Sequence, residues 1–288
     1  DMKVFTQELR FTSTDDSSVQ WLGGFYYSMY EEKMRSELIW WNTEAIGDNF
    51  TGPLGCAAGM DTCSGVWAGE TLTLAQEQLN LRTPFELRDR DKSHLAAFVN
   101  MTSTYDDWEL GLGLRIDKWE NESTNLDSGL SGDTNDTEIL PKFSLTRFRE
   151  NGSILYFTAS QGYEPGGFNM SNLSGSTSLL GFDKEEATSF EIGMKGRSED
   201  GKTSYTLAAF SIGYDARQIE YHIDEGASGI VEGIINMGDS EQSGLELDIT
   251  HRVNDFLNLS FSAGWVDAEW KDGAVAGGVD LSGNSPPV

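Results

Sequence analysis

The residue types that most often carry chemistry are few and scattered in this sequence. The three histidines, His94, His222 and His251, lie far apart, and none belongs to a zinc-binding or nucleophile-activating motif. The sequence contains no Gly-x-Ser-x-Gly, no His-Glu-x-x-His and no phosphate-binding loop. For the acidic stretch 183–186 we favour a solvated boundary between a loop and a strand over a cation site. We therefore expect no enzyme activity, no cofactor and no resident metal.

The two cysteines, Cys56 and Cys63, are seven positions apart in a glycine-rich stretch. Zinc would need further ligands, and no histidine is close to them in the sequence. This pattern favours a local disulfide in an oxidising compartment over two free thiols.

Composition and charge exclude several classes of protein. The 288 residues include 47 acidic and 20 basic side chains, which gives a net charge of -27. Such a surface repels phosphate backbones, so we expect no nucleic-acid partner. No apolar run approaches the roughly 20 residues of a membrane helix, but strands that cross a membrane show only alternation. The 32 glycines and only 6 prolines favour many strands joined by tight turns.

Apolar and polar residues alternate along much of the chain, as in strands with two different faces. The stretch 108–119 places Leu110, Leu112, Leu114 and Ile116 on one face. Similar stretches predict ten strands, at roughly 3–13, 20–31, 92–104, 107–120, 138–148, 153–163, 185–198, 202–215, 241–252 and 256–270. Most are longer than the roughly 5 to 6 residues of an average strand and long enough to cross a bilayer.

The connections between these strands alternate in length. Short turns fall near residues 15–16, 105–106, 150–152, 199–201 and 254–255, whereas long connections cover 32–91, 121–137, 164–184, 216–240 and the residues after 270. This alternation is typical of an outer-membrane β-barrel, with short periplasmic turns and long extracellular loops. A soluble β-sandwich gives no reason for it. We predict an all-β, antiparallel transmembrane barrel of which about ten strands are present.

The same assignment gives each face of the strands a role. Polar side chains line a wet interior, and apolar side chains contact lipid. The interior set is Glu8, Arg10, Arg115, Asp117, Glu246 and Asp248. Aromatic residues near the ends of the apolar stretches are expected to form interfacial girdles: Trp108, Trp119, Trp265 and Trp270. The alternative is that these aromatics belong to the core and edges of a soluble sheet.

Several ordered stretches resemble strands of TonB-dependent outer-membrane receptors. The most specific is Gln161-Gly162-Tyr163-Glu164-Pro165-Gly166-Gly167-Phe168-Asn169, preceded by Pro141-Lys142-Phe143-Ser144-Leu145. Others follow the family's order along essentially the whole chain: 5–11, 21–27, 112–115, 186–195, 208–210, 243–248 and 264–268.

This resemblance implies a 22-stranded barrel with an N-terminal plug, in the outer membrane of a Gram-negative bacterium. Such receptors take up scarce ligands, most commonly iron–siderophore complexes, with energy from TonB. Residues 1–288 are then expected to be an internal part of the barrel, without the plug and the C-terminal strands. A passive porin-like channel and a secreted β-sandwich binding module are the alternatives.

Candidate ligand-binding residues lie on the side of the long connections. The longest, 34–90, carries Trp40, Trp41 and Trp67, which an exposed loop has little structural reason to hold. The second candidate set is Tyr163, Phe168 and Asn169, around the turn at 165–167. Alternatively, Trp40 and Trp41 continue a strand above the membrane and Tyr163 belongs to the girdle.

Overall fold

The described part of the chain consists of strands, turns and irregular segments. A computed structural model describes residues 1–14, 17–41, 62–67, 70–75, 80–126, 129–169, 180–224 and 230–287. None of these residues forms a helix with the length and apolarity that a membrane span requires.

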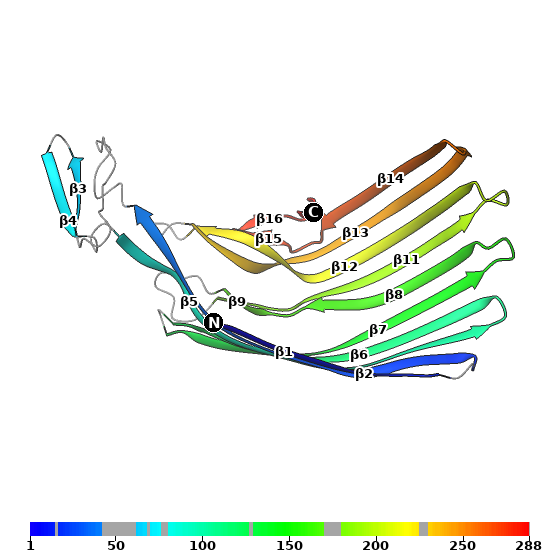
Figure 1. The fold of residues 1–288 in the computed structure, drawn as a ribbon, viewed down its shortest axis with the longest axis horizontal. Helices are drawn as coiled ribbons and strands as arrows, with labels where there is room; N and C mark the ends of the chain where they lie inside the picture. Colours follow the sequence, from blue (N-terminus) through cyan, green and yellow to red (C-terminus); the bar gives the residue numbers. More distant parts are fainter. Residues whose placement is uncertain are drawn as a thin grey trace.

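Ten strands form one antiparallel sheet (Figure 1) in the order β1-β2-β5-β6-β7-β8-β11-β12-β13-β14. Each strand pairs with the next along this order, as in a barrel wall, and the sheet curves into a trough (Figure 1). The ten strands are β1 (Met2–Thr12), β2 (Val19–Trp41), β5 (Asn80–Tyr105), β6 (Trp108–Asn125), β7 (Ser131–Phe148), β8 (Ile154–Glu164), β11 (Glu185–Arg197), β12 (Thr203–Asp224), β13 (Ile230–Asn254) and β14 (Leu257–Trp270).

Six shorter strands form three separate two-stranded sheets. They are β3 (Thr62–Trp67) with β4 (Glu70–Ala75), β9 (Gly167–Asn169) with β10 (Leu180–Phe182), and β15 (Val275–Ala276) with β16 (Val279–Asp280). The alternation pattern did not predict these hairpins, because each is too short to show a period.

All ten predicted strands are present in the predicted order. The tight turns near 105–106, 150–152, 199–201 and 254–255 are also where they were expected, and they lie at one end of the sheet (Figure 1). Two of these turns contain glycines with left-handed backbone angles, Gly152 at a φ of 76° and Gly201 at a φ of 68°. Few other residues adopt that conformation without strain.

At the opposite end, several strands are longer than predicted. β6 continues to Asn125 and β7 begins already at Ser131, so most of the expected loop 121–137 is paired strand. β12 and β13 likewise take up most of 216–240. Alternation of apolar and polar residues stops where the lipid-facing part ends, whereas backbone pairing continues beyond it. The sequence pattern therefore marks the lipid-facing part of each strand and not its full length.

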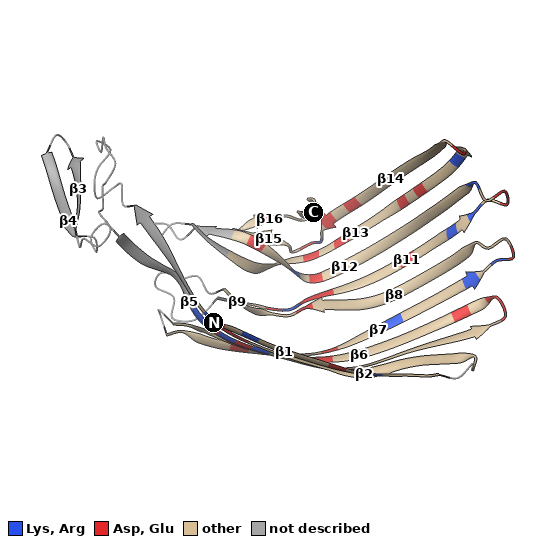
Figure 2. Cartoon of the chain, viewed as in Figure 1, with Lys and Arg blue, Asp and Glu red and all other residues tan. Residues whose placement is uncertain are grey.

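The cross-strand register places the apolar side chains on one face of the sheet. Leu112 lies between Met101 of β5 and Phe143 of β7 and is 51% exposed. Charged residues on this face lie toward the two ends of the strands. At the loop end Lys3 of β1 contacts Glu31 of β2 at 2.9 Å, and at the turn end Arg147 of β7 lies over the ring of Trp108. In the middle of the strands charged positions are few (Figure 2), and those of β6, Arg115 and Asp117, belong to the inner face. A broad apolar band followed by a charged rim is the pattern of a lipid-facing barrel wall.

Two of the four predicted girdle tryptophans lie elsewhere. Trp108 and Trp265 are exposed on strands β6 and β14, at 39% and 58%. Trp119 lies eleven residues after Trp108 on β6, so it points to the opposite, inner face. Trp270 is only 3% exposed and packs with Met237 and Ala274 at the outer end of β13. The prediction was wrong for Trp119 because an odd number of residue steps separates it from Trp108, which turns it to the other face. It was wrong for Trp270 because this side chain belongs to a local apolar cluster.

Candidate functional site

A hairpin between β8 and β11 doubles back at the loop end of the sheet. It consists of β9 and β10, which pair over three residues. A Cβ atom on Gly166 would lie 2.7 Å from the carbonyl oxygen of Phe182, and one on Gly167 would lie 2.8 Å from its ring. Both distances are too short for a carbon atom. At position 166 the obstacle is backbone, so this approach of the two strands requires glycine there, whereas a side chain at position 167 would displace the Phe182 ring.

Side chains of the hairpin attach it to two distant strands. Asn169 is buried, and its Nδ2 donates a hydrogen bond to the Ile234 carbonyl of β13 at 2.7 Å. The Ile234 N–H in turn donates to Asn169 Oδ1, also at 2.7 Å. The Phe168 ring occupies the space that a side chain on Gly132 of β7 would fill, with ring atoms 2.6 Å from the ideal Cβ position. The hairpin therefore lies across the inner face between β7 and β13.

Gln218 of β12 holds the two ends of the hairpin segment. The pairing of β12 with β13 shifts register between Tyr214 and Arg217, and Ala216 has a φ of 53°. Such a bulge redirects the side chains that follow it. Gln218 Nε2 donates to the carbonyl oxygens of Pro165 at 3.1 Å and Asp183 at 3.0 Å.

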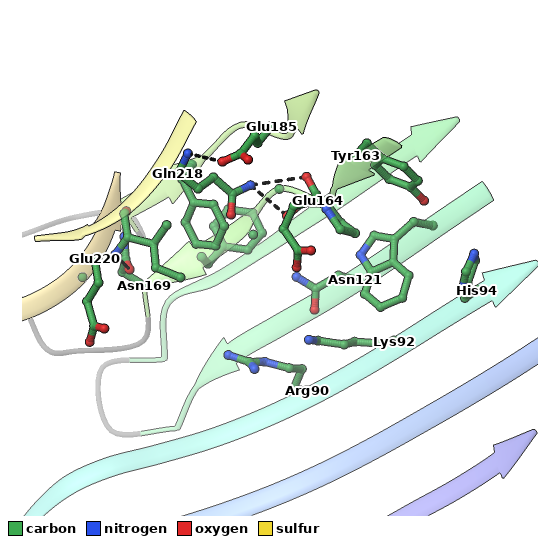
Figure 3. A pocket seen from close by; sticks show the side chains of 18 of the residues that line it. Arg90, Lys92, His94, Asn121, Tyr163, Glu164, Asn169, Glu185, Gln218 and Glu220 are labelled. Carbon is green, nitrogen blue, oxygen red and sulfur yellow. Dashed lines mark hydrogen bonds between the residues drawn. The ribbon is translucent and has the colours of Figure 1, made fainter. Parts of the chain in front are cut away.

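A cavity of about 950 Å³ lies between this hairpin and the inner faces of β5 and β6 (Figure 3). Its volume is at the upper end of the range for small-molecule sites. Four aromatic side chains line it: Trp119, Tyr163, Phe168 and Phe182. Aromatic walls with a few charged groups are the usual composition of a ligand pocket.

Charged side chains divide the cavity into two sides (Figure 3). The basic side consists of Arg88, Arg90 and Lys92, which alternate along β5. The acidic side consists of Glu164, Glu185 and Glu220, from β8, β11 and β12. On the basic side, Arg88 binds both carboxylate oxygens of Glu32, at 2.9 and 3.2 Å.

Lys92 differs from Arg88 in having no acidic partner within the described residues. Its ammonium group lies 6.0 Å from the centre of the Tyr30 ring and 5.6 Å from that of the Trp119 ring. These distances are within the range of cation–π attraction. The indole N–H of Trp119 is itself buried and has no hydrogen-bond acceptor among the described residues.

At one end of the cavity, a buried carboxylate is already neutralised. Asp117 is 3% exposed, and its Oδ1 lies 2.6 Å from Arg115 Nε. Its Oδ2 lies 3.2 Å from His94 Nε2, and the His94 ring packs edge-on against Tyr26 and Trp119. His94 is thus held in place by an acid and two aromatic rings, with no serine or cysteine in this cluster for it to activate.

A second ion pair ties the connection after β10 to the sheet. Lys184 donates a hydrogen bond to the carboxylate of Glu138 on β7, and Glu138 is nearly buried. This contact raises the pKa of the Lys184 ammonium above its ordinary value. No group of three or more His, Cys, Asp or Glu side chains suited to hold a metal occurs in the described ranges.

The structure places the predicted ligand-binding residues in two locations. Tyr163, Phe168 and Asn169 come together at the cavity. Trp40 and Trp41 end β2 and Trp67 ends β3, but their side chains lie outside the described residues. Of the six predicted residues, the described side chains are therefore those of Tyr163, Phe168 and Asn169.

The cysteines are not described well enough to test the predicted disulfide. Cys56 lies outside the described residues. Only the backbone of Cys63 is described, within β3. The disulfide stays a prediction.

The sequence analysis missed the basic side of the cavity. Its signal is present in the sequence, because Arg88, Arg90, Lys92 and His94 alternate with Asp89, Asp91 and Ser93. That alternation is polar on both faces, so a search for apolar stripes does not detect it.

The chain is similar to a known family over nearly its whole length. The model of the family described as "TonB dependent receptor-like, beta-barrel" matches residues 5–288. Among curated proteins, the "Probable TonB-dependent siderophore receptor PiuA" of Acinetobacter baumannii is 28% identical over 204 residues, covering 65% of this chain and 26% of the relative. The "Metal-pseudopaline receptor CntO" of Pseudomonas aeruginosa is 24% identical over 213 residues, covering 69% and 28%.

Solved structures show the same fold. The ferric yersiniabactin uptake receptor FyuA of Yersinia pestis aligns with a TM-score of 0.64 at 17% identity, covering 97% of this chain and 37% of that one. The chain thus spans between a quarter and two fifths of the length of these relatives.

Proposed function

Because the chain belongs to the TonB-dependent receptor β-barrel family, we propose that it forms part of the wall of a receptor that carries an iron–siderophore complex across the outer membrane of a Gram-negative bacterium. The cavity at the loop end carries this proposal. It has the size and aromatic lining of a small-molecule site. It also lies at the end opposite the tight turns, where a ligand arriving from outside the cell would enter.

The open edges of the sheet support a larger protein. In the described sheet, β1 pairs only with β2, and β14 pairs only with β13. Unpaired backbone groups are not tolerated in the hydrocarbon region of a bilayer, so a spanning sheet must close. We infer that further strands complete the barrel and that a plug and a TonB contact belong to the same receptor.

Iron uptake by the source bacterium tests the proposal. We expect deletion of the gene to remove uptake of ⁵⁵Fe carried in the strain's own iron-limited spent medium, and the full-length gene to restore it. A protonophore should block uptake but leave binding at the cell surface, because TonB uses the proton gradient. Uptake that persists with the protonophore would instead indicate a passive channel. Normal uptake after deletion would refute a role in iron acquisition.

The loop tryptophans give a second test of the same site. In the full-length receptor, we expect removal of the segment around Trp67 to weaken binding of the ⁵⁵Fe species while the barrel still folds in detergent. Unchanged binding would assign capture to the cavity at Tyr163 and Phe168 alone.

A further inference from the structure

The two-sided charge of the cavity indicates the kind of ligand that it accepts. The basic side and the acidic side face one space (Figure 3), although the chain as a whole carries a net charge of -27. A cavity that attracted anions would need only basic side chains, and one that excluded anions would need only acidic side chains.

The basic side contains donors prepared for an anionic acceptor. Lys92 is held between two rings without an acidic partner among the described residues, and the buried indole N–H of Trp119 belongs to one of those rings. A buried donor without an acceptor is costly, and so is an ammonium group removed from water. A carboxylate or phenolate oxygen of a ligand would compensate the charge of the Lys92 ammonium group.

The acidic side has no basic partner among the described residues, although Glu164 and Glu220 are exposed to solvent. Glu164, Glu185 and Glu220 form no ion pair with any described residue. The Gln218 backbone N–H donates to Glu185 Oε2 at 2.6 Å, which fixes that side chain but leaves its charge. Three carboxylates lining one cavity repel each other, and a cation between them would relieve that repulsion.

The two sides are separated by a distance that a small molecule can span. β5 and β8 are three strand spacings apart in the sheet, which is about 14 Å along its curve. The curvature of the sheet turns these two walls toward each other (Figure 3). Lys92 and Glu164 form no ion pair, although the Glu164 carboxylate is close enough to act electrostatically on the Lys92 ammonium group.

We propose that the cavity binds a zwitterionic metal chelate, with its anionic oxygens toward Lys92 and Trp119 and a protonated amine toward the acidic side. This inference rests on the proposed function and narrows its ligand. It also sets a chemical limit, because a chelate of uniform charge would leave one side of the cavity uncompensated.

Binding of three defined chelates to the purified full-length receptor tests the inference by calorimetry. The first is the Fe³⁺ complex of Nα,Nα-bis(carboxymethyl)-L-lysine, which has carboxylates at one end and an ammonium group at the other. The second is its Nε-acetyl derivative, which lacks only the ammonium charge. The third is ferric citrate, which has no cationic group. We expect the first to bind about tenfold or more tightly than either of the others.

Matched variants separate the two sides. Lys92→Gln should weaken the lysine chelate and its acetyl derivative alike, about tenfold, whereas Lys142→Gln, on the inner face outside the cavity, should change neither. The double variant Glu164→Gln with Glu220→Gln should weaken only the lysine chelate, whereas Glu246→Gln should change neither. Retained heat-modifiable mobility of each variant on gels would show that the barrel still folds.

Three results would overturn the inference. The first is equal affinity for the lysine chelate and its acetyl derivative, and the second is tighter binding of ferric citrate. The third is no binding of any chelate by a receptor that still supports ⁵⁵Fe uptake from spent medium, which would leave the proposed function intact. If deletion of the gene leaves both ⁵⁵Fe uptake and binding at the cell surface unchanged, the proposed function is refuted instead.

Discussion

An arginine introduced in the middle of the apolar band should destabilise the barrel far more than one introduced beside it on the inner face. Leu112→Arg places the charge on the outward face of β6, between Met101 and Phe143. Ser144→Arg is the matched control. It lies on β7 directly after Phe143, opposite Gly111, so its side chain points to the inner face at nearly the same height.

The structure sets the size of the effect. On β6 the outward apolar band runs from Trp108 to Ile116, eight residue steps of about 3.4 Å each. At a strand tilt of about 40°, this corresponds to a height of about 21 Å, close to the band of about 25 Å found in such barrels. Leu112 is four residues from either end and so lies near the midplane. Arginine there costs about 2–4 kcal/mol, whereas a charge in a wet interior costs little.

Equilibrium unfolding by guanidinium chloride of the full-length receptor in lipid vesicles measures this difference. A loss of 2–4 kcal/mol corresponds to a roughly thirty- to nine-hundredfold fall in the ratio of folded to unfolded protein. Ser144→Arg should remain within about 1 kcal/mol of the unsubstituted receptor. Equal penalties for the two variants would show that the apolar face does not contact lipid, and a larger penalty for Ser144→Arg would reverse the two faces.

Three further predictions concern topology, the cysteines and the hairpin. In intact cells, a cysteine at Ser131 should react with an impermeant thiol probe and one at Asp200 should not; reaction at Asp200 alone would invert the topology. Mass spectrometry of non-reduced peptides from the native membrane should find Cys56 linked to Cys63, and free thiols would exclude the link. Asn169→Ala should remove both hydrogen bonds to β13, costing about 1–3 kcal/mol locally; amide exchange at β9 should then accelerate, and unchanged protection would show that packing alone holds the hairpin.

The sequence predicted the parts of the fold that lipid controls. Along Leu110 to Ile116 the period of two is strict, and enough of the other strands show it for strand order and faces to follow from it. Above the band this constraint disappears. The extended ends of β12 and β13 also contain the bulge at Ala216, which interrupts any simple alternation.

The site was predictable only in part, because it depends on contacts between distant strands. The Pro165-Gly166-Gly167 turn led to Tyr163, Phe168 and Asn169, which do line the cavity. Their role in binding remains a prediction. The opposite wall comes from β5, about seventy residues earlier, and only the curvature of the sheet brings the two together. No local pattern reports that curvature.

The way in which the hairpin is held bears on how such a protein can evolve. Gln218 holds it through the carbonyl oxygens of Pro165 and Asp183, and Asn169 binds the main chain of Ile234. Apart from Asn169, the glycines at 166 and 167 and the packed rings of Phe168 and Phe182, these attachments do not depend on which side chains the hairpin carries. Substitutions of the lining residues outside the hairpin, such as Trp119 and Tyr163, can therefore accumulate one at a time while the hairpin keeps its position. The chemistry of the cavity wall can thus change by single substitutions while the hairpin stays attached to β12 and β13.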